Sequence, residues 1–412
     1  SNITHASFHE MGWILAGLNR VLEEEPDNAE AEKRASELVR GLRSLVYERK
    51  IKTFWSGDYK FEDEIYQFPS DLYIKGEGFV PERISGRGEE AIRNAVLLQP
   101  LVVRAERQND EVALDLAKGI ANYTLTMSRY FNYKSEFFGH VHSAVWFAMG
   151  LVRLGKFVKN EYYIEKAYRI YSYVKRISSE YGWVPEYAQW APMSETHCET
   201  CCIRDMIECA LELIDCGYDE WELVDKYTRN HLTEQQFTYG GFVAVDNSRE
   251  DTEDRTWKNL DKRMIGGWSG GGEANSLSIS KFRSIAGCCV GTAPQALFAV
   301  WDNIIKCVGE RVYINLPMEC ENDAARVEIG YPNEGCMKIT FKKDCDAYIR
   351  LYGWMGDRVE LSVNGKCVPI VNRDSCAYAE NVHKSDVLEI RHRLATVEKK
   401  EIVQDKEYTV SW

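Results

Sequence analysis

Apolar residues recur at helical spacing through the first three quarters of the chain, and they alternate with polar residues in the last quarter. Met11–Leu18 and Ala35–Leu42 show the helical spacing, with apolar positions three or four residues apart. The pattern returns over 88–107, 111–130, 138–155, 160–179, 199–215, 219–235 and 292–306. Long helices joined by short loops, with no strands between them, predict helical hairpins arranged as an (α/α) barrel. A helical-repeat solenoid is the alternative, but no clear repeat period supports it.

From about residue 311 the spacing of apolar residues changes to period two. The alternating runs are Arg311–Leu316, Ala325–Ile329, Met337–Phe341, Ala347–Leu351, Arg358–Val363 and Val387–Arg391. Asn364-Gly365 is a strong signal for a two-residue hairpin turn. We therefore predict two domains, a helical barrel over 1–308 and an antiparallel β-sandwich over 309–412. The end of the chain, Tyr408–Trp412, still has the character of a strand.

A long, glycine-rich segment over 236–286 separates the last two predicted helices. Such a loop in a compact domain is usually functional or disordered. Its aromatic residues, which include Trp257 and Trp268, favour an ordered lid or rim.

Composition and charge narrow the class of partner. The net charge is −13 without a dense basic stripe, which argues against nucleic acid and an anionic membrane surface. No stretch approaches the roughly 20 apolar residues that span a bilayer. The first residues, Ser1–His5, show no signal peptide and no initiator Met, so we expect a cytoplasmic protein whose N-terminus is incomplete. A homodimer formed through the sandwich is left open.

Two short runs stand out among the thirteen cysteines, most of which we expect to be reduced and buried. Glu199-Thr200-Cys201-Cys202 and Gly287-Cys288-Cys289-Val290 together offer thiols and a carboxylate from distant parts of the chain. Soft sulfur ligands with a carboxylate suit Zn²⁺, which is usually four-coordinate in proteins. If the fold brings the runs together, they form a metal–thiolate centre.

The spacing alone leaves the ligand set open. One set is Glu199, Cys201, Cys288 and Cys289, and its rival is a closed Cys₄ site in which Cys198 replaces the carboxylate. A third reading has four buried thiols and no metal.

Both runs precede helices. Thr292 is a candidate N-cap and Pro294 fits an early helical position, so Cys288 and Cys289 are expected just before a helix N-terminus. The helix dipole there favours the thiolate.

An acidic and aromatic patch lies upstream, at 181–190. Aromatic surroundings favour a protonated carboxylic acid, which makes Glu186 a candidate general acid. Glu195 is a second candidate. Aromatic faces such as those of Trp183 and Tyr187 also suit the apolar faces of a sugar ring.

Three histidines are candidates for binding substrate. His140 and His142 lie at a predicted helix start, and in a helix they could not both face the same way. His197 adjoins the first cysteine run.

These residues resemble the β-L-arabinofuranosidases of glycoside hydrolase family 127 (GH127). The family has a Glu-Thr-Cys motif opening one helix and a Cys-Cys pair opening a later one, here Glu199-Thr200-Cys201 and Cys288-Cys289. Gly139-His140 and the stretch around Glu186 match two further elements, and the order fits over 139–412. Val290–Gln295 replaces the usual Pro-Pro-Asn-x-x-Arg, which indicates a divergent member.

The resemblance implies an (α/α)₆ barrel followed by a β-sandwich. It implies zinc held by Glu199, Cys201, Cys288 and Cys289, and retaining hydrolysis of a small glycoside. Cys288 would be the nucleophile and Glu186 the acid/base, while His140 and His142 would bind hydroxyl groups of the carbohydrate. The alternatives are a non-catalytic carbohydrate-binding scaffold with a structural zinc, and a sugar epimerase or lyase on the same barrel without zinc.

Overall fold

The structure is a computed structural model. It describes residues 5–50, 54–56, 59–61, 64–67, 72–74, 89–189, 196–241, 243, 245–273, 276 and 285–411.

Helices dominate the chain up to residue 304, as the apolar spacing predicts. They are α1 (Phe8–Glu24), α2 (Ala29–Leu45), α3 (Glu89–Asn94), α4 (Leu98–Gln108), α5 (Glu111–Thr126), α6 (Val141–Val158), α7 (Glu161–Ile177), α8 (Thr200–Ile214), α9 (Trp221–Tyr227), α10 (Leu260–Arg263) and α11 (Gly287–Ile304). Asn28, Asp110 and Asn160 begin α2, α5 and α7, because their side chains accept hydrogen bonds from backbone N–H groups of the first turn. Within the described residues, no helix combines the length and the apolar character needed to cross a bilayer.

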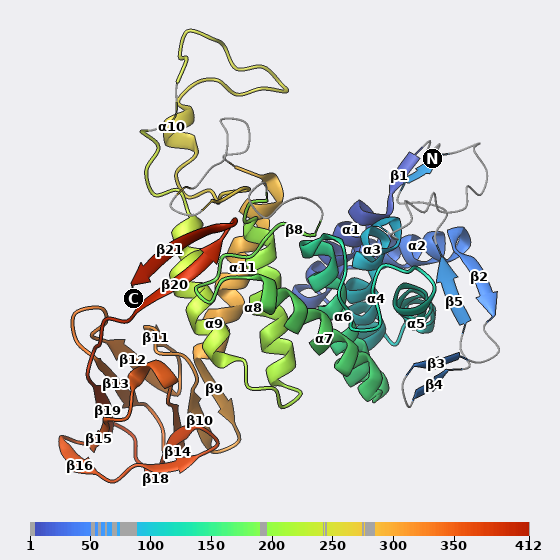
Figure 1. The fold of residues 1–412 in the computed structure, drawn as a ribbon. Helices are drawn as coiled ribbons and strands as arrows, with labels where there is room; N and C mark the ends of the chain where they lie inside the picture. Colours follow the sequence, from blue (N-terminus) through green and yellow to red (C-terminus); the bar gives the residue numbers. More distant parts are fainter. Residues whose placement is uncertain are drawn as a thin grey trace.

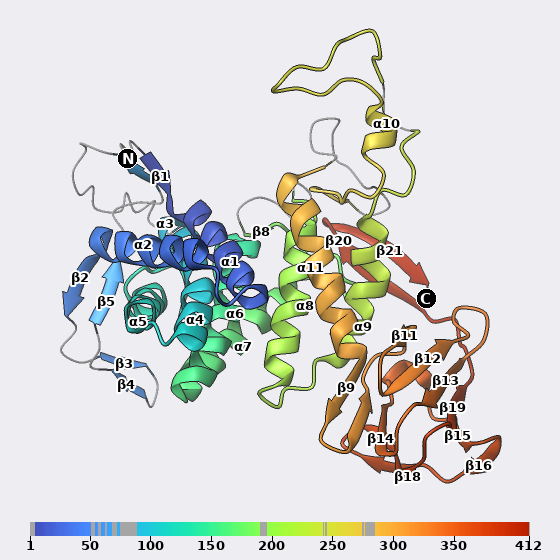
Figure 2. The same ribbon diagram turned by 180° about the vertical axis from the view of Figure 1, so that it is seen from behind.

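The helices form two layers (Figures 1 and 2). Helices α1, α4, α6, α8 and α11 pack side by side in chain order, and α2, α5, α7 and α9 each pack on the helix that precedes them in this row. Helix α6 has apolar residues on almost every side because α4, α7 and α8 surround it. The N-termini of α6, α8 and α11 carry the residues singled out by the sequence.

The last part of the chain folds into two main sheets. Their strands are β9 (Ile305–Val308), β10 (Arg311–Ile314), β11 (Cys320–Glu321), β12 (Ala325–Ile329), β13 (Cys336–Phe341), β14 (Cys345–Arg350), β15 (Val359–Val363), β16 (Lys366–Val368), β17 (Val371–Arg373), β18 (Cys376–Val382) and β19 (Val387–His392). One sheet has the order β17-β18-β14-β10-β9 and the other β11-β12-β13-β19-β15-β16. The predicted C-terminal antiparallel sheet region is thus confirmed, except that β10 and β14 pair in parallel. Asn364 and Gly365, both with positive φ, form the predicted hairpin turn between β15 and β16.

A hairpin of β20 (Glu398–Val403) and β21 (Lys406–Ser411) lies outside both sheets and packs on the helical part. The side-chain amide of Gln404 donates to the backbone oxygen of Thr196 at 2.7 Å, and the backbone N–H of Glu180 donates to Glu401 at 3.0 Å. We expected the strand-like end of the chain to belong to the sandwich. Instead it returns to the helices (Figure 1).

Several short strands in the helical part escape prediction because two to four residues show no period. Three pairs lie near the N-terminus: β1 (His5–Ser7) with β6 (Leu72–Ile74), β2 (Tyr47–Lys50) with β5 (Glu64–Gln67), and β3 (Phe54–Ser56) with β4 (Tyr59–Phe61). A fourth joins β7 (Gly139–His140) to β8 (Tyr187–Ala188). This last pair connects the two segments that carry His140 and Glu186.

The described part of the glycine-rich segment is mostly irregular and contains only the short helix α10. Phe237 and Trp268 are buried, so aromatic side chains anchor this segment to the body of the protein. It then leads into α11 and its cysteine pair.

Candidate active site

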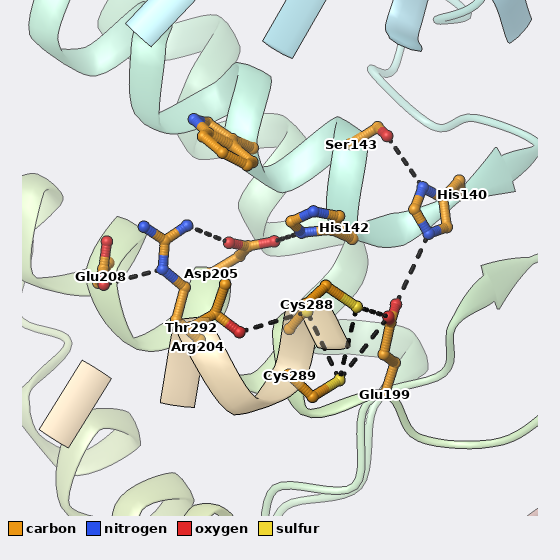
Figure 3. A network of polar contacts seen from close by, with 12 residues as sticks. His140, His142, Ser143, Glu199, Arg204, Asp205, Glu208, Cys288, Cys289 and Thr292 are labelled. Atoms are coloured by element: carbon orange, nitrogen blue, oxygen red, sulfur yellow. Dashed lines mark hydrogen bonds and ion pairs between the residues drawn. The ribbon is translucent and has the colours of Figure 1, made fainter. Parts of the chain in front are cut away.

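Glu199, Cys201, Cys288 and Cys289 converge at the N-termini of α8 and α11 (Figure 3). Cys289 Sγ lies 3.6 Å from Cys201 Sγ and 3.9 Å from Cys288 Sγ. Glu199 Oε1 lies 3.2 Å from Cys288 Sγ and 3.8 Å from Cys289 Sγ. The two runs, far apart in sequence, therefore form a single cluster.

The helix starts place these four groups. Glu199 has an extended backbone and is the N-cap residue of α8, so Cys201 falls in the first turn. Helix α11 begins at Gly287, which puts Cys288 and Cys289 in its first turn as well. Two helix N-termini thus direct their partial positive charge at one cluster, which favours anionic ligands.

The predicted start of α11 is wrong. The N-cap is Ala286 rather than Thr292, and Pro294 lies inside the helix. The carbonyl of Val290 loses its helical partner to the proline, but Val290 is exposed, so water can replace that partner. Thr292 instead contacts the cluster, with its Oγ1 3.3 Å from Cys201 Sγ.

The cluster has the chemistry and spacing of a zinc site. A tetrahedral zinc with Zn–S bonds of about 2.3 Å would hold its sulfur ligands about 3.8 Å apart. The observed separations of 3.6 and 3.9 Å bracket that value. One atom from each of the four residues lies within 4.8 Å of the others, and Glu199 is buried with one carboxylate oxygen, Oε2, lacking a hydrogen-bond partner. The four residues therefore fit a metal ion.

Cys198, the distinctive member of the rival Cys₄ set, is directed elsewhere. Its buried sulfur accepts a hydrogen bond from the backbone N–H of Val184 at 3.4 Å. Burial raises the pKa of this thiol, so it stays neutral. The cluster contains the Glu199 carboxylate in its place.

The three clustered thiols differ in their ease of ionisation. Hydrogen bonds from Cys201 and Cys289, followed by that with Glu199, lower the pKa of Cys288. Hydrogen bonds with Cys288 and Cys289 raise the pKa of Cys201, which is fully buried. Cys288 is exposed, whereas Cys289 is buried. Cys288 is therefore the sulfur best able to act as a nucleophile towards an incoming molecule.

Glu186 lies next to the cluster and is held by backbone hydrogen bonds on both sides. The backbone oxygen of Glu186 accepts a hydrogen bond from the backbone N–H of Val141 at 2.9 Å. The backbone N–H of Glu186 donates to the backbone oxygen of His197 at 2.7 Å. The carboxylate pairs with His197 Nε2. One of its oxygens lies within 4.8 Å of ligand atoms of both His140 and Glu199. A carboxyl group that could transfer a proton thus stands beside the cysteine cluster.

His140 and His142 both reach the site, although we expected them to diverge. His140 is the N-cap residue of α6 and has an extended backbone, whereas His142 lies in the first turn. The 100° step between helical residues therefore does not apply to the pair, and both side chains can face the site. Their ring centroids are 5.5 Å apart. His140 Nε2 is 3.7 Å from Glu199 Oε2, and its Nδ1 is 2.9 Å from Ser143 Oγ.

A buried charged network behind the cluster was missed by sequence reasoning. His142 Nδ1 pairs with Asp205, whose other oxygen accepts from Arg204 Nη1 at 2.7 Å. Arg204 also donates to Glu208 at 2.8 Å. Figure 3 shows this chain running away from the cysteines. Asp205 is four residues after Cys201, so the two lie on the same face of the helix. A charged residue on that face could have indicated the buried network from the sequence.

The remaining candidates fall into three groups. The side chain of Trp183 is only 1% exposed, so it packs in the core and the prediction of an open sugar platform is wrong for it. His197 is buried against Glu186, whereas Tyr187 is half-buried with its ring 5.4 Å from that of His140. Glu195 lies outside the described residues.

Comparisons by sequence find no family profile and no curated protein that matches the chain. Comparison of structures does find matches. A solved GH127 β-arabinofuranosidase superposes with a TM-score of 0.53 at 14% identity, covering 98% of this chain and 74% of the other. The chain has a GH127-type fold.

The resemblance seen in the cysteine motifs is therefore confirmed at the level of the fold. Two further solved structures are similar at lower scores. A GH127 β-L-arabinofuranosidase from Geobacillus stearothermophilus T6 gives a TM-score of 0.49 at 14% identity, covering 98% of this chain and 75% of that one. A GH76 α-mannanase from Bacteroides thetaiotaomicron gives 0.45 at 12% identity, covering 73% and 71%. At these identities the GH127 likeness establishes architecture, while chemistry must be argued from the site.

Proposed function

We propose that this chain is a retaining glycoside hydrolase that acts on a small glycoside such as a β-L-arabinofuranoside. The observation that carries the proposal is the cluster of Glu199, Cys201, Cys288 and Cys289 with Glu186 beside it. A scaffold protein would need the buried cluster for stability, but it would not need an exposed sulfur next to a carboxyl group.

Glu199, Cys201, Cys288 and Cys289 would hold Zn²⁺. Bound zinc would supply positive charge that keeps the thiols ionised at neutral pH. The protein contributes in the same direction, since hydrogen bonds from Cys201 and Cys289 lower the pKa of Cys288 and two helix N-termini face the cluster.

In the first step, Cys288 Sγ attacks the anomeric carbon and the C–O bond to the leaving group breaks. Glu186 gives its proton to the departing oxygen. The sugar is then joined to Cys288 through a C–S bond. In the second step, Glu186 takes a proton from water, the water oxygen attacks the anomeric carbon, and Cys288 leaves as a thiolate. Two inversions give net retention, and Glu186 exchanges the roles of acid and base.

Other side chains at the site are suited to holding the sugar. His140 and Tyr187 come from the paired strands β7 and β8, and both are partly accessible. His197 contacts the Glu186 carboxylate, so it would keep that group oriented.

The shared fold also supports a proposal about architecture. We infer that the row of α1, α4, α6, α8 and α11 belongs to an (α/α)₆ barrel domain, predicted over 1–308, and is followed by a β-sandwich domain, predicted over 309–412. In the structure the two main sheets run from β9 to β19, and the β20–β21 hairpin lies outside them.

A panel of nitrophenyl pentosides and hexosides tests the proposal. We expect turnover of at least one pentoside by the native protein, and its loss in Cys288→Ser with the fold retained by circular dichroism. Cys307→Ser is the matched control, since Cys307 is exposed on β9 and outside the cluster. Unchanged turnover in Cys288→Ser would remove Cys288 from the mechanism.

A further inference from the structure

A second group of potential metal ligands shares one residue with the cysteine cluster. His140, Glu186 and Glu199 each place a ligand atom within 4.8 Å of the others. Glu199 Oε1 contacts the sulfurs of Cys288 and Cys289, and Oε2 has no hydrogen-bond partner. Glu199 is only 8% exposed, and its Oε2 lies 3.7 Å from His140 Nε2. The carboxylate is therefore directed at both groups of ligands at once.

His140 is oriented as a metal-binding histidine would be. Its Nδ1 lies 2.9 Å from Ser143 Oγ, which leaves Nε2 facing Glu199. Histidines that bind metals usually have their other ring nitrogen held by a hydrogen bond in this way. One nitrogen and two carboxylate oxygens form a set of ligands that suits a divalent cation such as Zn²⁺.

The backbone fixes this second group before any ligand arrives. Strands β7 and β8 pair His140 with Tyr187, the residue after Glu186. The N–H of Val141 donates to Glu186 O at 2.9 Å, and the N–H of Cys198 donates to Gly272 O at 2.7 Å. Backbone hydrogen bonds thus fix the segments that carry His140, Glu186 and Glu199, so binding of a cation would need little rearrangement.

Charge also favours a second cation. When a divalent ion occupies the cysteine cluster, its three thiols would be ionised, and with the Glu199 carboxylate they would carry four negative charges, of which that ion neutralises two. Glu186 adds a further buried carboxylate, which pairs with His197 Nε2. Buried negative charges in contact repel one another unless a proton or a cation lies between them.

We propose that His140, Glu186 and Glu199 form a second divalent-cation site, bridged to the cysteine cluster by Glu199, and that its occupancy inhibits the enzyme. Inhibition follows because a coordinated Glu186 can neither give nor take the proton that the reaction requires. The inhibitory part rests on the proposed function, whereas the cation site stands on the geometry of its three residues.

Metal counting on the full chain tests the site without an activity assay. The protein is stripped with a chelator and titrated with Zn²⁺ alone, and bound metal is measured after equilibrium dialysis. We expect two equivalents, the second weaker than the first. His140→Ala and Glu186→Gln should weaken the second equivalent at least tenfold and retain the first. His383→Ala is the matched control, because His383 is exposed near Asp344 and should leave both equivalents unchanged.

Cobalt distinguishes the two sites by colour. The first Co²⁺ equivalent should give the near-ultraviolet band of a thiolate ligand, and the second should add none. Saturation of the native protein at one equivalent would overturn the proposal, as would a second equivalent that persists in both variants. Turnover that is unaffected while the second site fills would overturn the inhibitory part. An inactive native protein would count against the proposed function, and the metal count would still decide the cation site.

Discussion

Asp205 is fully buried and pairs with His142 Nδ1, one helical turn beyond the metal-ligand candidate Cys201 on α8. Burial of His142 alone would lower its pKa, but the charge of Asp205 outweighs this effect and raises it. The pair fixes the orientation of the imidazole, because the hydrogen bond at Nδ1 determines where Nε2 points. A salt-bridge partner deep in the helix layer thus sets the geometry of a side chain at the site.

Asp205→Asn is expected to destabilise the protein by about 3–5 kcal/mol. The change removes the carboxylate charge shared by two buried groups, Arg204 at 2.7 Å and His142, and leaves Arg204 paired with Glu208. Denaturant unfolding measures the difference. Asp215→Asn, at the exposed end of the same helix, removes only a surface pair with Lys156 and should cost at most about 1 kcal/mol. Equal losses in the two variants would contradict the role given to the buried network.

Glu186→Gln should affect substrates according to their leaving groups. Loss of a general acid typically lowers kcat by roughly 100- to 10,000-fold when the leaving group needs a proton. Dinitrophenyl glycosides leave readily without one, so their first step should be nearly unaffected. Steady-state kinetics on a leaving-group series measures the trend. A uniform loss of kcat/KM, which reports the first step, across the series would show that Glu186 does not protonate the leaving oxygen.

Removal of metal should make Cys288 reactive. Its thiol is exposed and its pKa is lowered by Cys201 and Cys289, so the freed sulfur would be a thiolate at neutral pH. We expect chelator treatment to accelerate alkylation of Cys288 at least tenfold, as followed by peptide mass spectrometry. Cys367, exposed on β16, provides the internal standard. Identical rates before and after chelation would argue that no metal protects the sulfur.

His231 should make the fold sensitive to acid. Burial lowers its pKa from 6.5 in the unfolded chain to about 4 in the folded protein. The unfolded state therefore binds up to one more proton between these values, so the stability contributed by neutral His231 is complete above about pH 6.5 and is lost as the pH falls towards 4.

His231→Gln should reduce this dependence, measured as the slope of unfolding free energy against pH. Glutamine retains a polar group towards Gln235, which lies 3.1 Å from His231. A slope that matches the native protein between pH 4 and 6.5 would rule out His231 as the acid-sensitive group.

The sequence was sufficient to predict what depends on local pattern. Helical spacing identified the helices, and alternation with Asn364-Gly365 identified the strands of the C-terminal sheets. The two cysteine runs identified the cluster because adjacent thiols have little packing value. Apolar periodicity and unusual residue types are readable in one dimension, and these were the features that carried the prediction.

What depends on long-range contact could not be read in this way. The choice between Glu199 and Cys198 required knowing which way each side chain turns at the start of α8. Trp183 was misjudged since an aromatic residue near a carboxylate can face the core as easily as a pocket. The short pairing of β7 with β8, which brings Glu186 to His140, has no period to detect.

The hairpin β20–β21 connects the candidate site with a distant part of the sequence. The side chain of Gln404 donates a hydrogen bond to the backbone oxygen of Thr196, 208 positions away in the sequence. The side chain of Glu401 accepts one from the backbone N–H of Glu180. These two anchors lie on either side of Glu186, and Thr196 is the residue before His197. The β20–β21 hairpin therefore supports the segment that carries Glu186 from outside, and a chain clipped before residue 398 would lose that support while keeping every proposed reactive group.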